Sequence, residues 1–178
     1  FVLEGSRAFG VSYLYANLLG NEAGRAIYDG GVLVASAGSL LAEGPRFSFA
    51  GWHLTTAMID VDATRTARAA THSYRPRLDA PAETCLERPF SYPQLRPSGP
   101  VPVALPAWQA GSDQKVEEFT RAIGLALLDY LTKSRSRGFV VSRSGGADSA
   151  AVAALVALAL EMAVAELGLP AVQARLAY

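Results

Sequence analysis

The residues best suited to chemistry stand in one run, Ser144-Gly145-Gly146-Ala147-Asp148-Ser149. Glycines at a helix start let backbone N–H groups curl around an anion, and the helix N-terminus adds about half a positive charge. The hydroxyls of Ser144 and Ser149 are further donors to phosphate oxygens. The carboxylate of Asp148 repels bare phosphate, so its presence is best explained by Mg²⁺ bridging the two. The run therefore predicts a phosphate-and-magnesium site.

A plain capping turn is the alternative, because glycine, serine and aspartate are common at helix starts. The run is not a Walker loop, since Gly-Lys-Ser/Thr is missing, and it is not the dinucleotide fingerprint Gly-x-Gly-x-x-Gly. The complete string between an apolar strand and a helix nevertheless favours nucleotide binding.

The elements around the run predict the opening of a doubly wound α/β domain. We expect a strand over 139–142 and a helix over 147–167, which Gly168 and Pro170 end. An earlier helix should begin at an N-cap, Ser112. Apolar residues at helical spacing predict its buried face, namely Val116, Phe119, Ile123, Leu127 and Tyr130. Helix, strand, glycine turn and helix follow one another as in such folds.

The chain before residue 76 has the signals of short strands. We expect strands over 11–18, 26–28, 32–36, 40–42 and 55–62, with glycine turns between them (Gly20-Asn21 after the first), a helical stretch over 63–70, and a strand starting at the C-terminus, 175–178. Eight of the ten prolines lie between Pro76 and Pro106, which predicts an extended connector. The predicted division is a first domain over 1–75, a linker over 76–111 and a second domain over 112–178.

Composition excludes some partners. The 16 basic and 16 acidic residues balance, which gives no support to a nucleic-acid partner. The apolar stretch 150–165 is expected to be too short and too weakly hydrophobic to span a membrane. The single cysteine, Cys85, agrees with a reducing, cytoplasmic setting. Because the chain starts at Phe1 without a signal peptide or a methionine, we expect a fragment of a longer protein.

The run Ser144–Ser149 resembles the pyrophosphate loop of the N-type ATP pyrophosphatases. The resemblance implies that Ser144, Gly145, Gly146, Asp148 and Ser149 bind ATP, with Asp148 as a Mg²⁺ ligand. These enzymes adenylate a carbonyl or carboxylate oxygen, and a nucleophile such as ammonia then displaces AMP. NAD synthetase, GMP synthetase, asparagine synthetase and tRNA-modifying enzymes share the motif.

The residues Ser12–Phe49 resemble the late part of a nitrilase-like amidase domain. Such a domain joined through a linker to a Ser-Gly-Gly-x-Asp-Ser domain is the arrangement of the glutamine-dependent NAD synthetases. The implied fold is the C-terminal part of a nitrilase-like α-β-β-α sandwich, a Pro-rich linker, and the start of a doubly wound ATP pyrophosphatase domain. The implied substrates are nicotinic acid adenine dinucleotide, glutamine and ATP, in an enzyme that forms homo-oligomers.

The catalytic residues implied by the resemblance lie outside this chain. Nitrilase-type amidases use a Glu–Lys–Cys triad, which precedes the matched region, so Cys85 is not the nucleophile. Glu22 and Glu43 beside hairpin turns are expected to be solvated, and His53 and His72 to be surface residues. Two alternatives stay open: another glutamine-dependent amidotransferase of the same superfamily, and a non-catalytic nucleotide-binding or subunit-contact segment.

Overall fold

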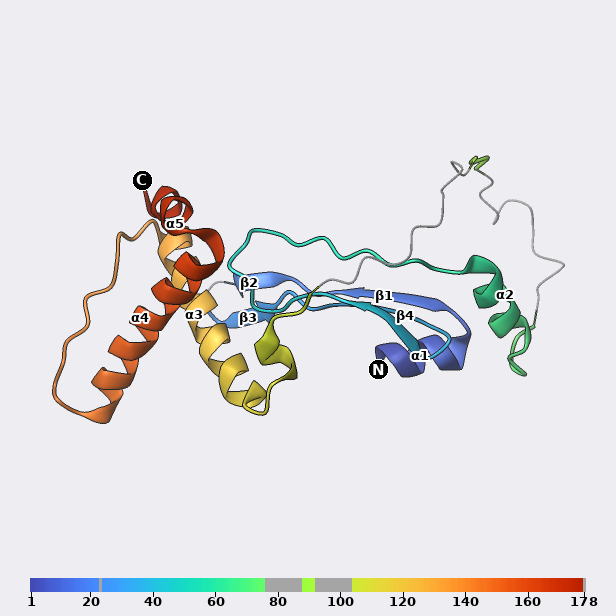
Figure 1. Cartoon of the computed structure of the whole chain (residues 1–178), viewed down its shortest axis with the longest axis horizontal. Helices are drawn as coiled ribbons and strands as arrows, with labels where there is room; N and C mark the ends of the chain where they lie inside the picture. Colours follow the sequence, from blue (N-terminus) through green and yellow to red (C-terminus); the bar gives the residue numbers. More distant parts are fainter. Residues whose placement is uncertain (23, 76–87, 92–103, 178) are drawn as a thin grey trace. The chain divides into compact units, whose positions relative to one another are not determined.

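The computed structural model describes residues 1–22, 24–75, 88–91 and 104–177 and shows a mixed α/β architecture (Figure 1). The chain divides into two compact units. The first comprises 1–14, 34–42 and 56–102, and the second comprises 15–33, 43–55 and 103–178. Cys85 and most of the Pro-rich segment lie outside the described residues. The division into domains at 76–111 stays a prediction.

The first unit holds two helices that approach closely. Helix α1 (Val2–Phe9) ends at Gly10, which has a positive φ of 57°. A Cβ on Gly10 would lie 2.7 Å from the backbone nitrogen of Arg68 in α2 (Val61–Ala69), so only glycine fits there. Helix α2 begins at Asp60, whose carboxylate accepts a hydrogen bond of 2.9 Å from the N–H of Ala63. The helical stretch expected over 63–70 is confirmed, whereas α1 has no counterpart in the sequence-based prediction.

A three-stranded sheet has the order β1 (Ser12–Ala16), β4 (Val32–Ser36), β5 (Ser39–Glu43). Strands β4 and β5 are joined by a two-residue turn, Ala37 and Gly38, with φ of 50° and 87°. Positive φ at both central residues is the geometry of a type I′ turn, whose twist matches that of the flanking strands. The strands expected over 32–36 and 40–42 are confirmed.

A second sheet is the antiparallel hairpin of β2 (Leu19–Glu22) and β3 (Ala26–Asp29), with Leu19 opposite Asp29 and Glu22 opposite Ala26. The single strand expected over 11–18 is therefore interrupted. Asn17 stands between β1 and β2, and its side-chain amide donates to Asp29 at 2.7 Å. The turn expected at Gly20-Asn21 is wrong, because both residues lie in β2 and pair with residues of β3.

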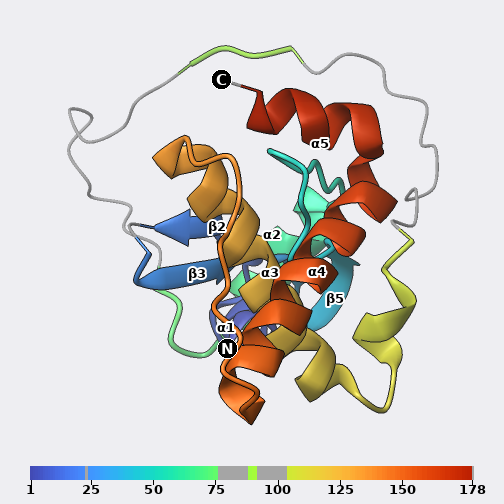
Figure 2. The same cartoon turned by 90° about the vertical axis from the view of Figure 1, so that its left-hand side faces the viewer.

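The second unit also contains the 3₁₀ helix η2 (Ala107–Ala110) and the helices α3 (Gln114–Ser134), α4 (Ala147–Leu167) and α5 (Leu169–Leu176). Helix α3 packs against α4, α5, η2 and the β2–β3 hairpin, and α5 packs against α4 (Figure 2). The core of this unit is a cluster of five buried side chains, Phe49, Leu125, Leu128, Ala163 and Val172. Residues from both sides of the Pro-rich segment thus share one core.

The buried face expected for α3 is wrong. Val116 and Phe119 are 67% and 63% exposed, and Tyr130 is exposed as well. The buried positions are instead Gly124, Leu125, Leu128 and Leu131. Helix α3 is apolar on two sides. Its partners α4 and the β2–β3 hairpin cover the side that carries Leu125 and Leu128, and not the side predicted from the spacing of apolar residues.

The strand expected over 139–142 is wrong, since this segment has no regular structure and Val140 is fully exposed. A strand needs neighbours to pair its backbone groups, and no strand of the described residues pairs with it. The strand expected over 55–62 is also wrong, because 55–60 have no regular structure and the last two residues belong to α2. The strand expected to start at 175–178 is wrong, because 175 and 176 are the last residues of α5, whose first turn contains Pro170.

The helix ends follow the sequence signals more closely. Helix α4 begins at Ala147 and ends at Leu167, as expected. Helix α3 has Asp113, not Ser112, at its N-cap position, and that side chain makes no capping hydrogen bond. Expected surface residues are confirmed as exposed at Glu22, His53 and His72, and Glu43 is partly buried.

Candidate functional site

The run Ser144–Ser149 forms the turn that leads into α4. Gly145 has a φ of 86°, and nothing lies within 4 Å of a Cβ placed on it. The Ser144 and Ser149 hydroxyl oxygens lie 3.4 Å apart, and the Ser149 hydroxyl also donates to the carbonyl of Gly146 at 3.1 Å. The turn is therefore positioned by glycine geometry and by one serine, with open space over its backbone.

The start of α4 offers N–H groups to an anion. Its N-cap is Gly146, which has no side chain to bind the first N–H groups of the helix. Gly145 and Gly146 are both exposed, so a phosphate can approach the backbone without meeting a Cβ. The residues present fit a polyphosphate such as that of ATP.

Asp148 lies in the first turn of α4 and is exposed. The structure brings Ser144, Gly146 and Ser149 together, but it places no second carboxylate with Asp148: among the described residues, no group of three His, Cys, Asp or Glu side chains is suited to hold a metal ion. One carboxylate beside a phosphate site fits Mg²⁺, which keeps several waters and takes phosphate oxygens as ligands. The assignment of Asp148 to Mg²⁺ stays a prediction.

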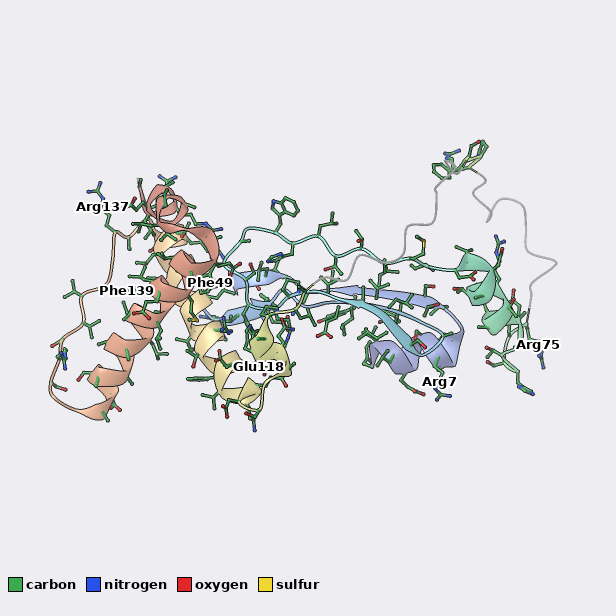
Figure 3. All side chains as sticks on the ribbon, in the orientation of Figure 1. Arg7, Phe49, Arg75, Glu118, Arg137 and Phe139 are labelled. Atoms are coloured by element: carbon green, nitrogen blue, oxygen red, sulfur yellow. The ribbon has the colours of Figure 1, made fainter. Side chains whose placement is uncertain are left out.

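Among the described residues, few contacts from elsewhere in the protein hold the Ser144–Ser149 turn in place. The segment before it, which carries Phe139 (labelled in Figure 3), contacts α3. The Phe139 ring stacks on that of Tyr130 with centroids 6.5 Å apart. Within α4, the buried residues are Ala159 and Ala163, both beyond the middle of the helix. The first half of α4 therefore carries the turn into solvent, while the second half packs against the rest of the unit.

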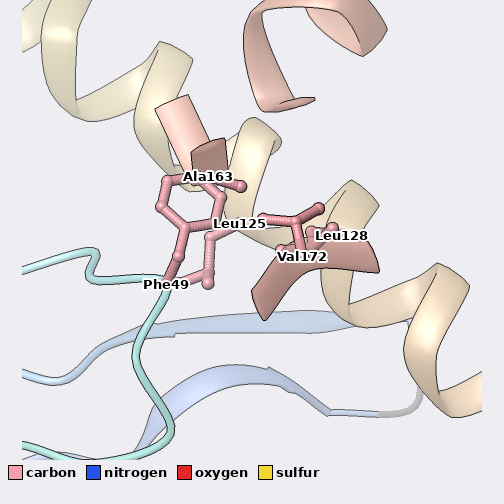
Figure 4. Close-up of a cluster of buried hydrophobic side chains, with 5 residues drawn as sticks. All are labelled: Phe49, Leu125, Leu128, Ala163 and Val172. Atoms are coloured by element: carbon pink, nitrogen blue, oxygen red, sulfur yellow. The ribbon is translucent and has the colours of Figure 1, made fainter. Parts of the chain in front are cut away.

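The other end of α4 is held by polar contacts. The carboxylate of Glu166 accepts hydrogen bonds from the Ser48 hydroxyl and from the N–H of Phe49, the latter at 3.1 Å. Arg175 of α5 donates to the carbonyl of Phe49 at 2.5 Å. The Phe49 ring lies among Leu125, Leu128, Ala163 and Val172 (Figure 4).

Sequence reasoning did not find Ser48, Phe49, Glu166 or Arg175. One signal was present: Glu166 is one of two carboxylates after the first turn of an otherwise apolar, alanine-rich helix. A charged residue on such a helix is expected to have a partner or to face water. Its partners lie more than 100 residues earlier in the chain, which no local pattern shows.

A cavity of about 560 Å³ lies beside this contact and is lined in part by Phe47, Trp108 and Glu166. Trp108 lies between two guanidinium groups, 5.4 Å from Arg46 and 5.0 Å from Arg121. Both arginines already have carboxylate partners on α3, Glu118 at 2.5 Å and Glu117 at 3.0 Å, respectively. These cations stabilise the junction of η2 and α3, because both are already paired with carboxylates.

Helix α4 has a further property. Among the described residues it is the helix that is long and apolar enough to cross a membrane by length and composition, with a mean hydropathy of 2.1. The expectation that the stretch 150–165 is too short and too weakly hydrophobic is therefore wrong by these two measures, since it lies within a helix of 21 residues. Core helices of soluble proteins pass the same test, so this is weak evidence for a membrane.

Comparison with known proteins first gives a class of enzyme. Residues 119–176, which include α4 and the Ser144–Ser149 turn, match the family model of NAD synthase.

Individual relatives narrow the class. The chain is 34% identical to the glutamine-dependent NAD(+) synthetase of Oryza sativa subsp. indica over 90% of its own length and 22% of that protein. It is 31% identical to the synthetase of Saccharomyces cerevisiae, over 87% of the chain and 22% of that protein. A crystal structure of a glutamine-dependent NAD(+) synthetase from Cytophaga hutchinsonii matches 98% of the chain and 21% of its own length, with a TM-score of 0.66 and 38% identity.

These matches confirm the resemblance noted in the sequence. The chain is related in sequence and in fold to the glutamine-dependent NAD(+) synthetases, and it spans about a fifth of the length of the relatives it matches.

Proposed function

We propose that the chain serves NAD(+) biosynthesis as part of a glutamine-dependent NAD(+) synthetase. In this proposal, residues 1–75 are the end of a nitrilase-like glutaminase domain, 76–111 a linker, and 112–178 the start of the ATP pyrophosphatase domain. The match to the NAD synthase family lies within the last of these ranges. The relatives named above support this enzyme over the other amidotransferases of the superfamily.

The proposed reaction is the ATP-dependent amidation of nicotinic acid adenine dinucleotide, with ammonia from glutamine. ATP supplies the adenylate that activates the carboxylate, and Mg²⁺ neutralises phosphate charge. The chain's own residues would bind and orient the nucleotide. Gly145, Gly146 and the first N–H groups of α4 would hold the phosphates, Ser144 and Ser149 would donate further hydrogen bonds, and Asp148 would hold Mg²⁺. The observation that carries the proposal is the open glycine turn at the N-terminus of α4.

Titration calorimetry with ATP and Mg²⁺ tests the site. The chain is expected to bind ATP with Mg²⁺ more tightly than without it, and Asp148→Ala is expected to abolish that difference. Asp62→Ala is the matched control, because Asp62 is also an exposed carboxylate in the first turn of a helix, α2. ATP binding that ignores both Mg²⁺ and Asp148 would contradict the metal assignment.

Assays of turnover test the assignment of the domains. The glutaminase triad and the dinucleotide site are proposed to lie outside this chain, so the chain alone is expected to form no NAD(+) and to hydrolyse no glutamine. Measurable turnover by the chain alone would overturn that assignment. The proposed enzyme acts on small molecules in the cytoplasm as a homo-oligomer, and light scattering on the whole enzyme checks the last point.

A further inference from the structure

The tripeptide Ser48-Phe49-Ala50 is bound in the second unit as a peptide ligand would be. Its aromatic ring is 1% exposed, and the helices α3, α4 and α5 together form the surrounding pocket (Figure 4). We call this pocket the Phe49 socket, and it consists of Leu125, Leu128, Ala163, Glu166, Val172 and Arg175.

Charged side chains form hydrogen bonds with the backbone of the tripeptide. The N–H of Phe49 donates to the Glu166 carboxylate at 3.1 Å, and its carbonyl accepts from Arg175 at 2.5 Å. The Ser48 hydroxyl donates to the same carboxylate and accepts from the N–H of Ala50 at 2.9 Å. Hydrogen bonds to charged groups are stronger than neutral ones, and because Glu166 is exposed, each contact here is worth about 0.2–1 kcal/mol. The socket therefore fixes both the ring and the main chain of the tripeptide.

The position of the socket on α4 gives it a role beyond packing. Within α4 the buried residues are Ala159 and Ala163, and the Glu166 contact is three residues further on. The helix is rigid over its 21 residues, so its anchored C-terminal half determines where its N-terminal turn points. The Ser144–Ser149 turn stands at that free end.

We infer that the Phe49 socket couples the segment before the Pro-rich stretch to the phosphate-binding turn, with Glu166 as the positioning residue. The inference rests on the proposed function, because the segment 43–55 then belongs to the end of the glutaminase domain and α4 to the synthetase domain. Glu166 contacts no substrate in this scheme. It sets the orientation of α4, and with it the direction in which the Ser144–Ser149 turn at the other end of the helix points.

The test measures the KM for ATP in the whole enzyme that carries these residues, with glutamine and with added ammonium as nitrogen source. Glu166→Gln removes the charge at nearly constant shape. Because the turn binds ATP whichever source supplies the ammonia, the variant is expected to raise the KM for ATP about fivefold with either source, the scale of one exposed charged contact, and to leave kcat within about twofold. Hydrogen exchange should show the same change without any activity: the Phe49 amide exchanges faster in the variant.

Two further variants separate coupling from simple loss of structure. Ser48→Ala removes the second donor to the same carboxylate, so the double variant should be no worse than Glu166→Gln alone. Glu161→Gln is the control, because Glu161 is an exposed carboxylate on the same helix and lies outside the socket.

Each outcome has one meaning. If the unchanged enzyme makes no NAD(+) from either source, the proposed function fails. If it makes NAD(+) and Glu166→Gln leaves the KM for ATP unchanged, or lowers kcat instead, the positioning inference is overturned. If Glu166→Gln fails to fold, Ser48→Ala decides: a higher KM for ATP at unchanged kcat supports the inference, and an unchanged KM for ATP contradicts it.

Discussion

The two ends of α4 are held in opposite ways. At the C-terminal end, the carboxylate of Glu166 and the buried Ala163 lock the helix onto Phe49. At the N-terminal end, Gly145 and Gly146 are exposed and nothing crowds the backbone of Gly145. A phosphate site needs free N–H groups, which are costly to bury unpaired, so the binding end stays in contact with water. The stability of the unit must then come from the other end.

The largest expected effect comes from emptying the socket. Phe49→Ala removes a ring that is 1% exposed and leaves a cavity, so the free energy of unfolding should fall by about 3–5 kcal/mol. Urea denaturation followed by circular dichroism measures this. Trp52→Ala, three residues later and 75% exposed, is the control and should change it by less than about 0.5 kcal/mol. Similar losses in the two variants would show that the socket is not the centre of the unit.

The second prediction concerns the contact between the β2–β3 hairpin and α3. This contact belongs to the packed part of the unit, like the C-terminal end of α4. A Cβ on Gly20 would lie 2.3 Å from the Asp129 carboxylate, whereas nothing lies within 4 Å of a Cβ on Gly24, and both glycines have a positive φ. Gly24→Ala should cost about 1 kcal/mol from backbone strain alone. Gly20→Ala should cost about 1 kcal/mol more, because the Asp129 carboxylate must move and then loses its 2.9 Å hydrogen bond from the N–H of Asn21. Equal costs in denaturant would contradict this account of the contact.

The third prediction compares glycines at the two ends of α4. Gly145 and Gly168 have φ of 86° and 82°, and neither has a neighbour closer than 3.9 Å to an added Cβ. Gly145→Ala should cost about 1 kcal/mol of stability. Gly168→Ala should cost about 1–3 kcal/mol, because its ψ of 150° together with its positive φ is a geometry that almost only glycine adopts. Gly145→Ala alone should also weaken the binding of ATP with Mg²⁺ about tenfold, because the added methyl group keeps a phosphate oxygen from reaching the backbone N–H groups. Calorimetry on both variants checks this, and a matching loss in Gly168→Ala would remove the turn's special role.

The smallest effect is expected at the exposed pair of Tyr28 and Glu22. The Tyr28 hydroxyl donates to the Glu22 carboxylate at 2.6 Å, and this hydrogen bond, with the carboxylate's charge, raises the pKa of Tyr28 above its ordinary range. The pair stabilises the fold below the pH at which an unfolded tyrosine ionises, and this stabilisation is lost as pH rises through the higher pKa of the folded state. Glu22→Gln should lower the pKa of Tyr28, as followed by NMR. Glu43→Gln is the control, and a fall in that variant as well would contradict the assignment.

The sequence carried the local features of the molecule better than the long-range ones. The limits of α4, the strands of the β4–β5 hairpin and the glycine turn all follow from propensity and turn chemistry within a few residues. The strand expected over 139–142 failed for a different reason. Strand formation depends on a neighbour, and no strand of the described residues pairs with this segment.

The buried face of α3 and the Phe49 socket could not be predicted from the sequence for a related reason. Several apolar residues of α3 lie at helical spacing on more than one side, and only the packing of α4 and the hairpin selects Leu125 and Leu128 for burial. Glu166 shows the same limit, because its partners are Ser48 and Phe49. The candidate site fared differently: glycine, serine and aspartate at a helix start carry their chemistry in local order, so a short string was enough to propose it.

The distance along the chain between Phe49 and its socket governs when the second unit can fold. Ser48 and Glu166 are 118 residues apart, and Phe49 and Arg175 are 126 apart. During synthesis at about 5–20 residues per second, Phe47, Phe49 and Trp52 leave the ribosome several seconds before α4 and α5 exist. These aromatic side chains remain exposed for that time, and a core closed by such distant contacts forms slowly. The nascent chain is therefore expected to be a substrate for chaperones until α5 emerges.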